Sequence, residues 1–459
     1  MPCRAVPCCF DCYRADFASI SRKLPQELRF RNNPHMTYQP SLDYARRRDE
    51  ADPLRSFRER FALPRDERGQ LTVFLCGHSL GLMPLAARTI INEELDDWSR
   101  LAVLGHEHAR RPWIPYHENL TAGLAHLTGA RASEVIAMNS LTVNIHLMLA
   151  SFFRPAAGRA KILIETGAFS SDRHAVTSQL AWHGLDPAQH LIELTPPPGS
   201  DAIPEDAIED CLAEHGSDIA LLLWPGVQFR TGQAFDLQRI ARAGRRAGCV
   251  VGFDLAHSIG NMPLALHDYD ADFAVWCSYK YLNAGPGAIG GCFVNERHLE
   301  SQPHLMGWWG HEEPTRFRME PHFRPAPGIA AWQISNPPIL AAAPLLASLA
   351  IFQEARIERL RAKSIELTGF LEYLIERLKP DAQFITPREV DARGCQISIR
   401  IGGSATRGRR VFERLGERGV VCDWRDPNVI RVAPVPLYNT FEEVFRFSEH
   451  LADALREIQ

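Results

Sequence analysis

The sequence lacks the features that mark membrane-spanning and nucleic-acid-binding proteins. Its longest apolar run, from Ile339 to Phe352, has 14 residues and contains Pro344 and Ser348, whereas about 20 apolar residues are needed to cross a bilayer. Lysine and arginine number 51 against 55 aspartates and glutamates, so no excess of positive charge predicts binding to nucleic acid or to a membrane surface. With 45% hydrophobic and 23% charged residues, the composition is typical of a globular protein with a sizeable core.

The sequence also lacks the paired cysteine spacing of a disulfide framework. Four of its 11 cysteines crowd the first 12 residues, and the others are scattered singly, such as Cys249 and Cys292 in apolar runs. This placement favours a reducing compartment, so we expect a cytoplasmic protein. The Cys-rich start could bind a metal ion, but no second CxxC or HxxxH follows, and we predict no metal site. We expect residues 1–35 to be a disordered tail, or the product of an upstream start codon that precedes Met36.

Two common phosphate-binding motifs are absent as well. No GxGxxG follows the first predicted strand and no GxxxxGK[ST] occurs, which gives little support to a nicotinamide dehydrogenase or a P-loop enzyme. From Leu71 onward the sequence alternates short apolar runs with helical segments. Strands are predicted at 161–165, 218–224, 249–254, 271–278 and 288–294. This alternation is typical of a parallel sheet covered by helices on both faces.

The pattern changes in the last quarter of the chain. One long amphipathic helix is predicted at about 350–378, followed by a smaller α/β unit with strands at 396–401 and 429–432 and helices at 407–418 and 441–458. The predicted organisation is therefore a tail (1–35), an N-terminal arm with a large domain (36–345), and a small C-terminal α/β domain (346–459).

The strongest local signal is a carboxylate, an imidazole and an amine that follow two successive predicted strands. Asp254 ends the run CVVGFD, His257 comes three residues later, and Lys280 follows the run ADFAVWCS. Open α/β sheets bind ligands where their strands end. A lysine desolvated there would have a lowered pKa and could act as a nucleophile or base. Taken singly, the three also fit a helix N-cap, a packed core histidine and a solvated lysine.

Together, the amine and the carboxylate fit pyridoxal 5′-phosphate (PLP), which binds a lysine as a Schiff base and has its pyridine nitrogen held protonated by an acid. The phosphate of such a cofactor needs a cradle. Ser140 and Thr142 open an apolar helix, where hydroxyls and free backbone N–H groups attract anions. After the strand KILIE, Phe169 can stack on a ring and Asp172 can accept a hydrogen bond. By themselves these segments also fit a plain capping turn and a loop.

Ten segments resemble those of kynureninases in the same order: FLCGHSLGLMP, LGHEHARRPWI, MNSLTVN, AFSSD, GVQFRTGQ, GFDLAHSIGN, WCSYKYLNAGPG, GWWGHEEPTRFRM, QISNPPIL and IRVAPVPLYN. Kynureninases are PLP enzymes of the fold-type-I aminotransferase superfamily, and the resemblance covers roughly residues 41–459. It implies a large domain with a mainly parallel sheet covered by helices, and a smaller C-terminal α/β domain. The implied reaction hydrolyses L-kynurenine or 3-hydroxy-L-kynurenine to an anthranilate and L-alanine, in tryptophan catabolism and NAD precursor synthesis.

The resemblance also implies roles for individual residues. Lys280 would be catalytic through its Schiff base with PLP, and Tyr279 would be either a proton shuttle or only a phosphate ligand. Trp308 and Asn336 would come from the partner subunit of an obligate homodimer and complete the site. The implied cofactor-binding residues are Leu141, Thr142, Phe169, Ser170, Ser171, Asp172, Asp254, His257, Tyr279, Lys280, Trp308 and Asn336.

Four residues are implied to bind the substrate: Ser79, His106, Asn336 and Arg431. Arg431 would clamp the substrate carboxylate through its guanidinium fork, although it also fits an exposed strand arginine. His106 and Asn336 resemble the pair that reads the aryl ring in enzymes that prefer the 3-hydroxylated substrate. We therefore favour 3-hydroxykynurenine.

Some positions depart from the family pattern. His78 stands where the family usually has Asn, and Pro225 stands where many members have a Ser that can touch the phosphate; proline offers neither a hydroxyl nor an N–H. An alternative is another fold-type-I PLP enzyme, a class V aminotransferase or a cysteine desulfurase. A desulfurase needs a mobile loop cysteine, whereas Cys395 and Cys422 lie in strand-like surroundings. A PLP-binding regulator without catalysis is a further alternative, although no helix-turn-helix is predicted.

Overall fold

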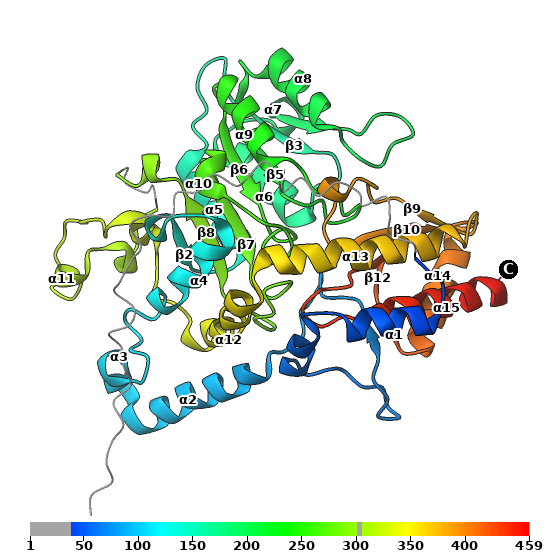
Figure 1. The fold of residues 1–459 in the computed structure, drawn as a ribbon. Coiled ribbons are helices and arrows are strands. Elements are labelled where there is room, and N and C mark those ends of the chain that lie inside the picture. Colours follow the sequence, from blue (N-terminus) through cyan, green and yellow to red (C-terminus); the bar gives the residue numbers. More distant parts are fainter. Residues whose placement is uncertain (1–37, 301–304, 459) are drawn as a thin grey trace, which may run out of the picture. The chain divides into compact units, whose positions relative to one another are not determined.

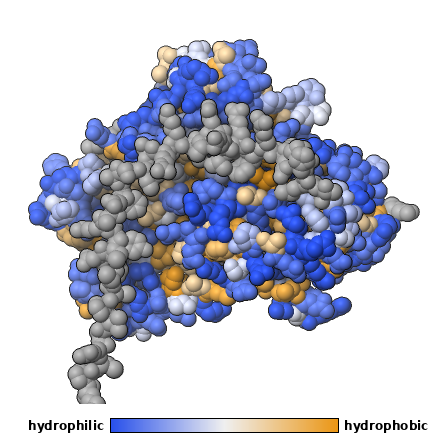
Figure 2. Space-filling model, in the orientation of Figure 1, coloured by the Kyte–Doolittle hydropathy of each residue, from blue (hydrophilic) through white to orange (hydrophobic). Residues whose placement is uncertain are grey.

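The computed structural model describes residues 38–300 and 305–458, and the prediction for residues 1–35 lies outside this part of the chain. The described residues form three sheets, of seven, four and two strands (Figure 1). The face drawn in Figure 2 is mainly hydrophilic, with apolar residues in smaller scattered areas.

The seven-stranded sheet has the order β2-β8-β7-β6-β5-β3-β4. Its strands are β2 (Val135–Ala137), β3 (Lys161–Glu165), β4 (Leu191–Leu194), β5 (Ile219–Pro225), β6 (Val250–Asp254), β7 (Phe273–Cys277) and β8 (Gly290–Val294). The five neighbouring strands β7, β6, β5, β3 and β4 pair in parallel, whereas β8 pairs antiparallel with both β7 and β2. The predicted mainly parallel sheet is therefore confirmed.

Helices cover both faces of this sheet, which explains why its strands are continuously apolar. Successive strand residues point to opposite faces, so Ile162 and Ile164 pack into one core and Leu163 into the other. The first core also contains residues of α5 (Leu141–Phe152) and α6 (Ser170–Trp182). The second also contains residues of α4 (Glu118–Thr128), α8 (Glu205–His215), α9 (Leu237–Arg246) and α12 (Ile339–Ala355).

The predicted single helix at 350–378 is wrong. The chain forms α12 and then α13 (Ile357–Glu376), which are bent by 80° at Arg356. Arg356 has φ 64°, a left-handed conformation that interrupts a right-handed helix. The predicted domain boundary near residue 345 falls inside α12, and the division into domains stays a prediction. Among the described residues no single helix could cross a membrane; this bent pair passes only by combined length and composition.

The four-stranded antiparallel sheet has the order β12-β13-β10-β9. Its strands are β9 (Ala382–Phe384), β10 (Ile397–Ile401), β12 (Asp423–Arg425) and β13 (Val429–Val432), and it packs with α13, α14 (Ala405–Glu417) and α15 (Phe441–Glu457). The N-terminal helix α1 (Leu42–Glu50) contributes Ala45 to the same core, and Asp49 accepts hydrogen bonds from the first N–H groups of α15. The strand β1 (Val73–Phe74) pairs in parallel with β11 (Val420–Val421), so residues after β1 lie beside the C-terminal sheet.

Candidate active site

A cavity of about 170 Å³ lies where the strands of the parallel sheet end. The carboxyl ends of neighbouring parallel strands meet at one edge of a sheet, and here β3, β5 and β6 end at Glu165, Pro225 and Asp254. The cavity is lined by Ser140, Leu141, Thr142, Glu165, Phe169, Ser171, Asp172, Pro225, Val227, Phe229, Asp254, Ala256, His257, Tyr279 and Lys280. The structure therefore brings most of the predicted cofactor-binding residues together.

Lys280 lies at the centre of this group and is half-buried. Its Nζ is 3.0 Å from Nε2 of His257, and it lies 5.7 Å from the ring centroid of Phe169 and 6.0 Å from that of Tyr279. The backbone around the lysine is held by Gly81, whose N–H donates to the carbonyl of Tyr279 at 2.8 Å. A Cβ at position 81 would lie 2.3 Å from the carbonyl oxygen of Lys280, so this close approach requires glycine.

Asp254 and Asp172 both line the cavity and are close enough to shift each other's pKa. Burial raises the pKa of both carboxyls, and the pKa of Asp172 is raised further by the charge of Asp254, whereas Lys280 opposes the rise at Asp254. Two neighbouring carboxyls in one buried site disfavour each other's ionisation. Ser171 donates to Asp172 at 3.1 Å, and Asp254 accepts the N–H of Ala256 at 2.7 Å. Asp254 thus also caps the turn that follows β6, through the N–H of Ala256.

Glu165 is a buried third carboxyl that the sequence analysis missed. Burial raises its pKa to about 8, and the charge of Asp254 adds to the rise. Gln228 Nε2 donates to Glu165 at 3.3 Å, and this amide is oriented by its Oε1, which accepts the N–H groups of Arg230 and Thr231. Glu165 ends the strand KILIE, so the strand-end argument that selected Asp254 could also have found it.

The other end of the cavity fits a phosphate. Ser140 occupies the N-cap position of α5 with extended backbone angles, but its hydroxyl does not cap the helix. The first N–H groups of this 12-residue helix thus lack a side-chain cap and face an anion-binding position. Thr142 and Tyr279 line the same cavity, and so does Pro225, which supplies no N–H there. The donors, the amine, the carboxyl pair and the ring of Phe169 together fit PLP.

A second cavity, of about 440 Å³, holds His106, Trp308 and Asn336. These three predicted residues lie together, but they do not line the cavity of Lys280 within one chain. Trp308 is 45% exposed and is joined there by Leu104 and Phe317, which are 58% and 55% exposed. Large apolar side chains exposed together mark an interaction surface.

Ser79 and Arg431 line neither cavity. Ser79 is exposed in the segment after β1. Arg431 is buried, which contradicts its alternative reading as an exposed strand arginine, and its fork is already paired with Asp423. Its Nε donates to Oδ1 at 3.0 Å, its Nη2 lies 2.8 Å from Oδ2, and its Nη1 donates to the carbonyl of Phe229 at 2.5 Å.

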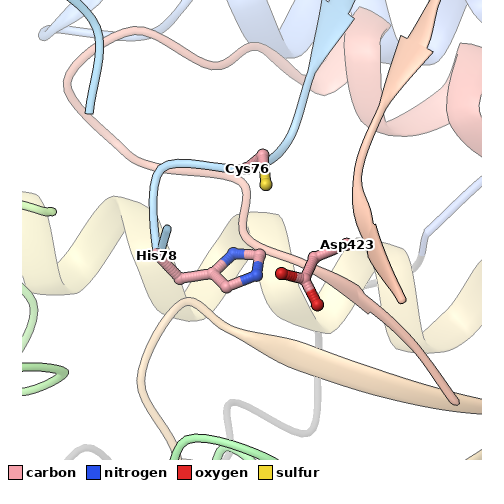
Figure 3. Close-up of side chains that lie close together, drawn as sticks. All are labelled: Cys76, His78 and Asp423. Atoms are coloured by element: carbon pink, nitrogen blue, oxygen red, sulfur yellow. The ribbon is translucent and has the colours of Figure 1, made fainter. Parts of the chain in front are cut away.

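His78 lies beside Asp423 (Figure 3). Ligand atoms of Cys76, His78 and Asp423 lie within 4.8 Å of one another, and these side chains are of types that bind Zn²⁺. However, both oxygens of Asp423 are already paired with Arg431 and Arg425, so a cation would compete with two guanidiniums. Neither ring nitrogen of His78 has a hydrogen-bond partner among the described residues, and burial holds its pKa well below its ordinary value, with Arg431 adding to the effect.

Comparisons with known proteins point to one family. Residues 360–451 match the family model of the kynureninase C-terminal domain. A kynureninase of Xanthomonas campestris pv. campestris (strain B100) is 56% identical over 91% of this chain and 98% of its own length. A kynureninase of Xanthomonas axonopodis pv. citri (strain 306) is 54% identical over 91% and 99%.

Solved structures show the same fold at low sequence identity. The cystine C–S lyase C-DES in complex with cysteine persulfide has a TM-score of 0.72 at 19% identity, over 83% of this chain and 97% of its own. The cysteine desulfurase CsdA from Escherichia coli has a TM-score of 0.71 at 17% identity, over 88% and 99%. These likenesses confirm the fold class alone. More than half of the aligned residues are shared with the Xanthomonas enzymes, and the chain belongs to the kynureninase family.

Proposed function

We propose that the chain hydrolyses the bond between Cβ and the aryl carbonyl of L-kynurenine or 3-hydroxy-L-kynurenine, with PLP as its cofactor, to give an anthranilate and L-alanine. The observation that carries this proposal is the placement of Lys280 beside Asp254 and His257 at the sheet edge of a kynureninase-family chain. PLP enzymes use a lysine amine to bind the cofactor as a Schiff base and a carboxyl to pair with its pyridine nitrogen.

When bound, PLP supplies an aldehyde that captures amines and a ring that withdraws electrons from the substrate carbon next to the amine. Asp254 would hold the ring nitrogen protonated, with Asp172 beside it in the cavity lining, and Phe169 would pack on the ring face. The first turn of α5, from Leu141 and Thr142, would hold the phosphate with Tyr279. Ser170 begins α6 and is assigned to the same site with Ser171.

The chain's own groups would then move protons. The Nζ of Lys280 would remove the α-proton of the substrate and return a proton at the end of the reaction. His257 Nε2, at 3.0 Å, would orient that amine. Burial and the charge of Lys280 hold the pKa of His257 well below its ordinary value, so the neutral imidazole would accept a hydrogen bond from the amine. The phenol of Tyr279 would shuttle a proton in the later steps.

The aryl group of the substrate would be read from a partner subunit of a homodimer. His106, Asn336 and Trp308 share one cavity with exposed apolar neighbours, apart from Lys280, and a second copy could bring them to the reaction cavity. Ser79 would contact the substrate from its own chain. A cytoplasmic location belongs to the same proposal and is supported by seven free cysteines among the described residues.

Purified protein loaded with PLP tests the proposal directly. With L-kynurenine the fluorescence of anthranilate is expected to appear together with stoichiometric L-alanine, and 3-hydroxykynurenine is expected to have the larger kcat/KM. Failure to release an anthranilate from either compound would contradict the proposed reaction.

A further inference from the structure

The hairpin β12–β13 places three charged side chains on one face of the C-terminal sheet. In its antiparallel register Asp423 lies opposite Arg431, and Arg425 lies opposite Val429. Residues two apart on a strand point to the same face, so Asp423 and Arg425 share the face on which Arg431 stands. The register thus gathers two guanidiniums around one carboxylate.

The charges of this group do not balance. Asp423 Oδ2 lies 2.8 Å from Arg431 Nη2 and accepts from Arg425 Nη2 at 3.2 Å, while Oδ1 lies 3.0 Å from Nε of Arg431 and 3.1 Å from Nε of Arg425. One positive charge is left over in a place that is partly shielded from water, which is costly unless an anion completes it. Burial and the neighbouring Arg431 both lower the pKa of Arg425.

The surplus charge adjoins the reaction cavity through Phe229. The ring of Phe229 lines that cavity and lies 5.1 Å from the ring of Phe169, centroid to centroid. The guanidinium carbons of Arg425 and Arg431 lie 5.7 Å and 5.9 Å from the same ring centroid. The carbonyl of Phe229 accepts from both Arg431 and Gln396, the latter at 2.7 Å. An anion bound by the two arginines would therefore lie beside the cavity wall.

The two arginines differ in how far an incoming ligand can reach them. The side chain of Arg431 is 2% exposed and has its Nε–Nη2 edge engaged by Asp423, whereas the side chain of Arg425 is 36% exposed. We propose that Arg425 is a second binding residue for the α-carboxylate of the substrate and selects α-amino acids over the corresponding amines. The inference rests on the proposed function only in taking the substrate to be an amino acid.

Binding of two small ligands to the PLP-loaded enzyme tests this assignment, with the cofactor absorbance as the signal. L-alanine carries the α-carboxylate and ethylamine lacks it. The change Arg425→Gln is expected to weaken L-alanine binding about tenfold, as for the loss of a charged hydrogen bond, and to leave ethylamine within about twofold. Arg425→Lys keeps the charge but loses the fork, and an intermediate loss of about threefold is expected.

Arg400→Gln is the matched control. Arg400 lies on β10 of the same sheet, its side chain is also 36% exposed, and it pairs with Asp201 instead. This variant is expected to bind both ligands like the wild type. The KM for kynurenine should rise about tenfold in Arg425→Gln while kcat stays within about twofold.

Two results would overturn the assignment: unchanged L-alanine binding in Arg425→Gln, or an equal loss of L-alanine and ethylamine. If Arg425→Gln does not fold, as judged by its thermal transition, the comparison of L-alanine with ethylamine in Arg425→Lys decides in the same way. A wild-type enzyme that binds L-alanine but releases no anthranilate would contradict the proposed reaction without affecting this inference.

Discussion

The reaction cavity is lined by more acidic than basic side chains, whereas the hairpin β12–β13 holds more basic than acidic ones, and Phe229 lies beside both. The cavity wall holds three buried carboxyls, Glu165, Asp172 and Asp254, facing one lysine. The hairpin holds two guanidiniums that share one carboxylate. The acidic wall suits a protonated pyridine ring, and the basic hairpin suits the carboxylate of an amino acid. The difference shows how one active site can hold two ligand groups of opposite charge by drawing on two different sheets.

The sharpest test of the acidic wall is the loss of the lysine that faces it. Lys280→Ala is expected to lower kcat by more than about 1000-fold, because the amine both anchors the cofactor and moves the α-proton. Anthranilate fluorescence measures the rate, and an unchanged thermal transition of the variant shows that it folds. Appreciable turnover by a folded Lys280→Ala protein would remove Lys280 from the mechanism.

Removing one charge from the wall should have the next largest effect. Asp254→Asn keeps the shape of the side chain but cannot balance a protonated ring nitrogen, so PLP affinity and kcat are each expected to fall on the order of 100-fold. Asp218→Asn serves as the control, because Asp218 precedes β5 at the opposite edge of the sheet and pairs with Lys161. Equal PLP affinity for the two variants, measured by absorbance titration, would contradict the assigned role.

Glu165 predicts how the stability of the apo protein depends on pH. Its pKa is raised by burial to about 8, so between the unfolded value and 8 the folded state holds a proton that the unfolded state has lost. The free energy of unfolding should therefore fall as pH rises towards 8, by at most about 1.4 kcal/mol per pH unit from this group.

Glu165→Gln should remove that slope, which urea unfolding of the apo protein at pH 6 and pH 8 would measure. Glu193→Gln on the neighbouring strand β4 is the control, because Glu193 pairs with Arg173 near the surface. The pH dependence should persist in this control. A slope that is the same in both variants would show that Glu165 is not its source.

The smallest expected effect concerns the ring between the two regions. Phe229→Leu keeps the apolar wall but removes the aromatic face near Arg425 and Arg431, and the KM should rise about three- to fivefold. Phe384→Leu is matched to it, because Phe384 also carries two guanidiniums, of Arg388 and Arg393, at 5.8 Å and 5.4 Å. A KM that changes equally in both variants would contradict the claim that the ring of Phe229 connects the hairpin arginines to the reaction cavity.

The acidic wall could be predicted from the sequence far better than the hairpin. Apolar runs such as KILIE and CVVGFD identify parallel strands, and residues at the ends of those strands must meet. Asp254, His257 and Lys280 were found in this way. Glu165 satisfies the same rule, because it is the last residue of β3 as Asp254 is the last residue of β6.

The hairpin was missed because its contacts depend on register rather than on composition. The strand β12 has three residues, Asp-Trp-Arg, two of them charged, so no apolar alternation marks it. The pairing of Asp423 with Arg431 follows only once the two strands are aligned. The bend at Arg356 was missed for a similar reason, since the apolar pattern continues across it and only the backbone conformation interrupts the helix.

The three-residue turn between β12 and β13 has a consequence for engineering. Asp426 and Pro427 in this turn are exposed, and replacing their side chains one by one would leave Asp423 opposite Arg431. An added residue would change the loop length that helps to fix the hairpin register, and a one-residue slip of the edge strand β12 against β13 would turn Asp423 and Arg425 to the other face of the sheet. The length of a solvent-facing turn thus sets the orientation of an amino-acid ligand that never touches it.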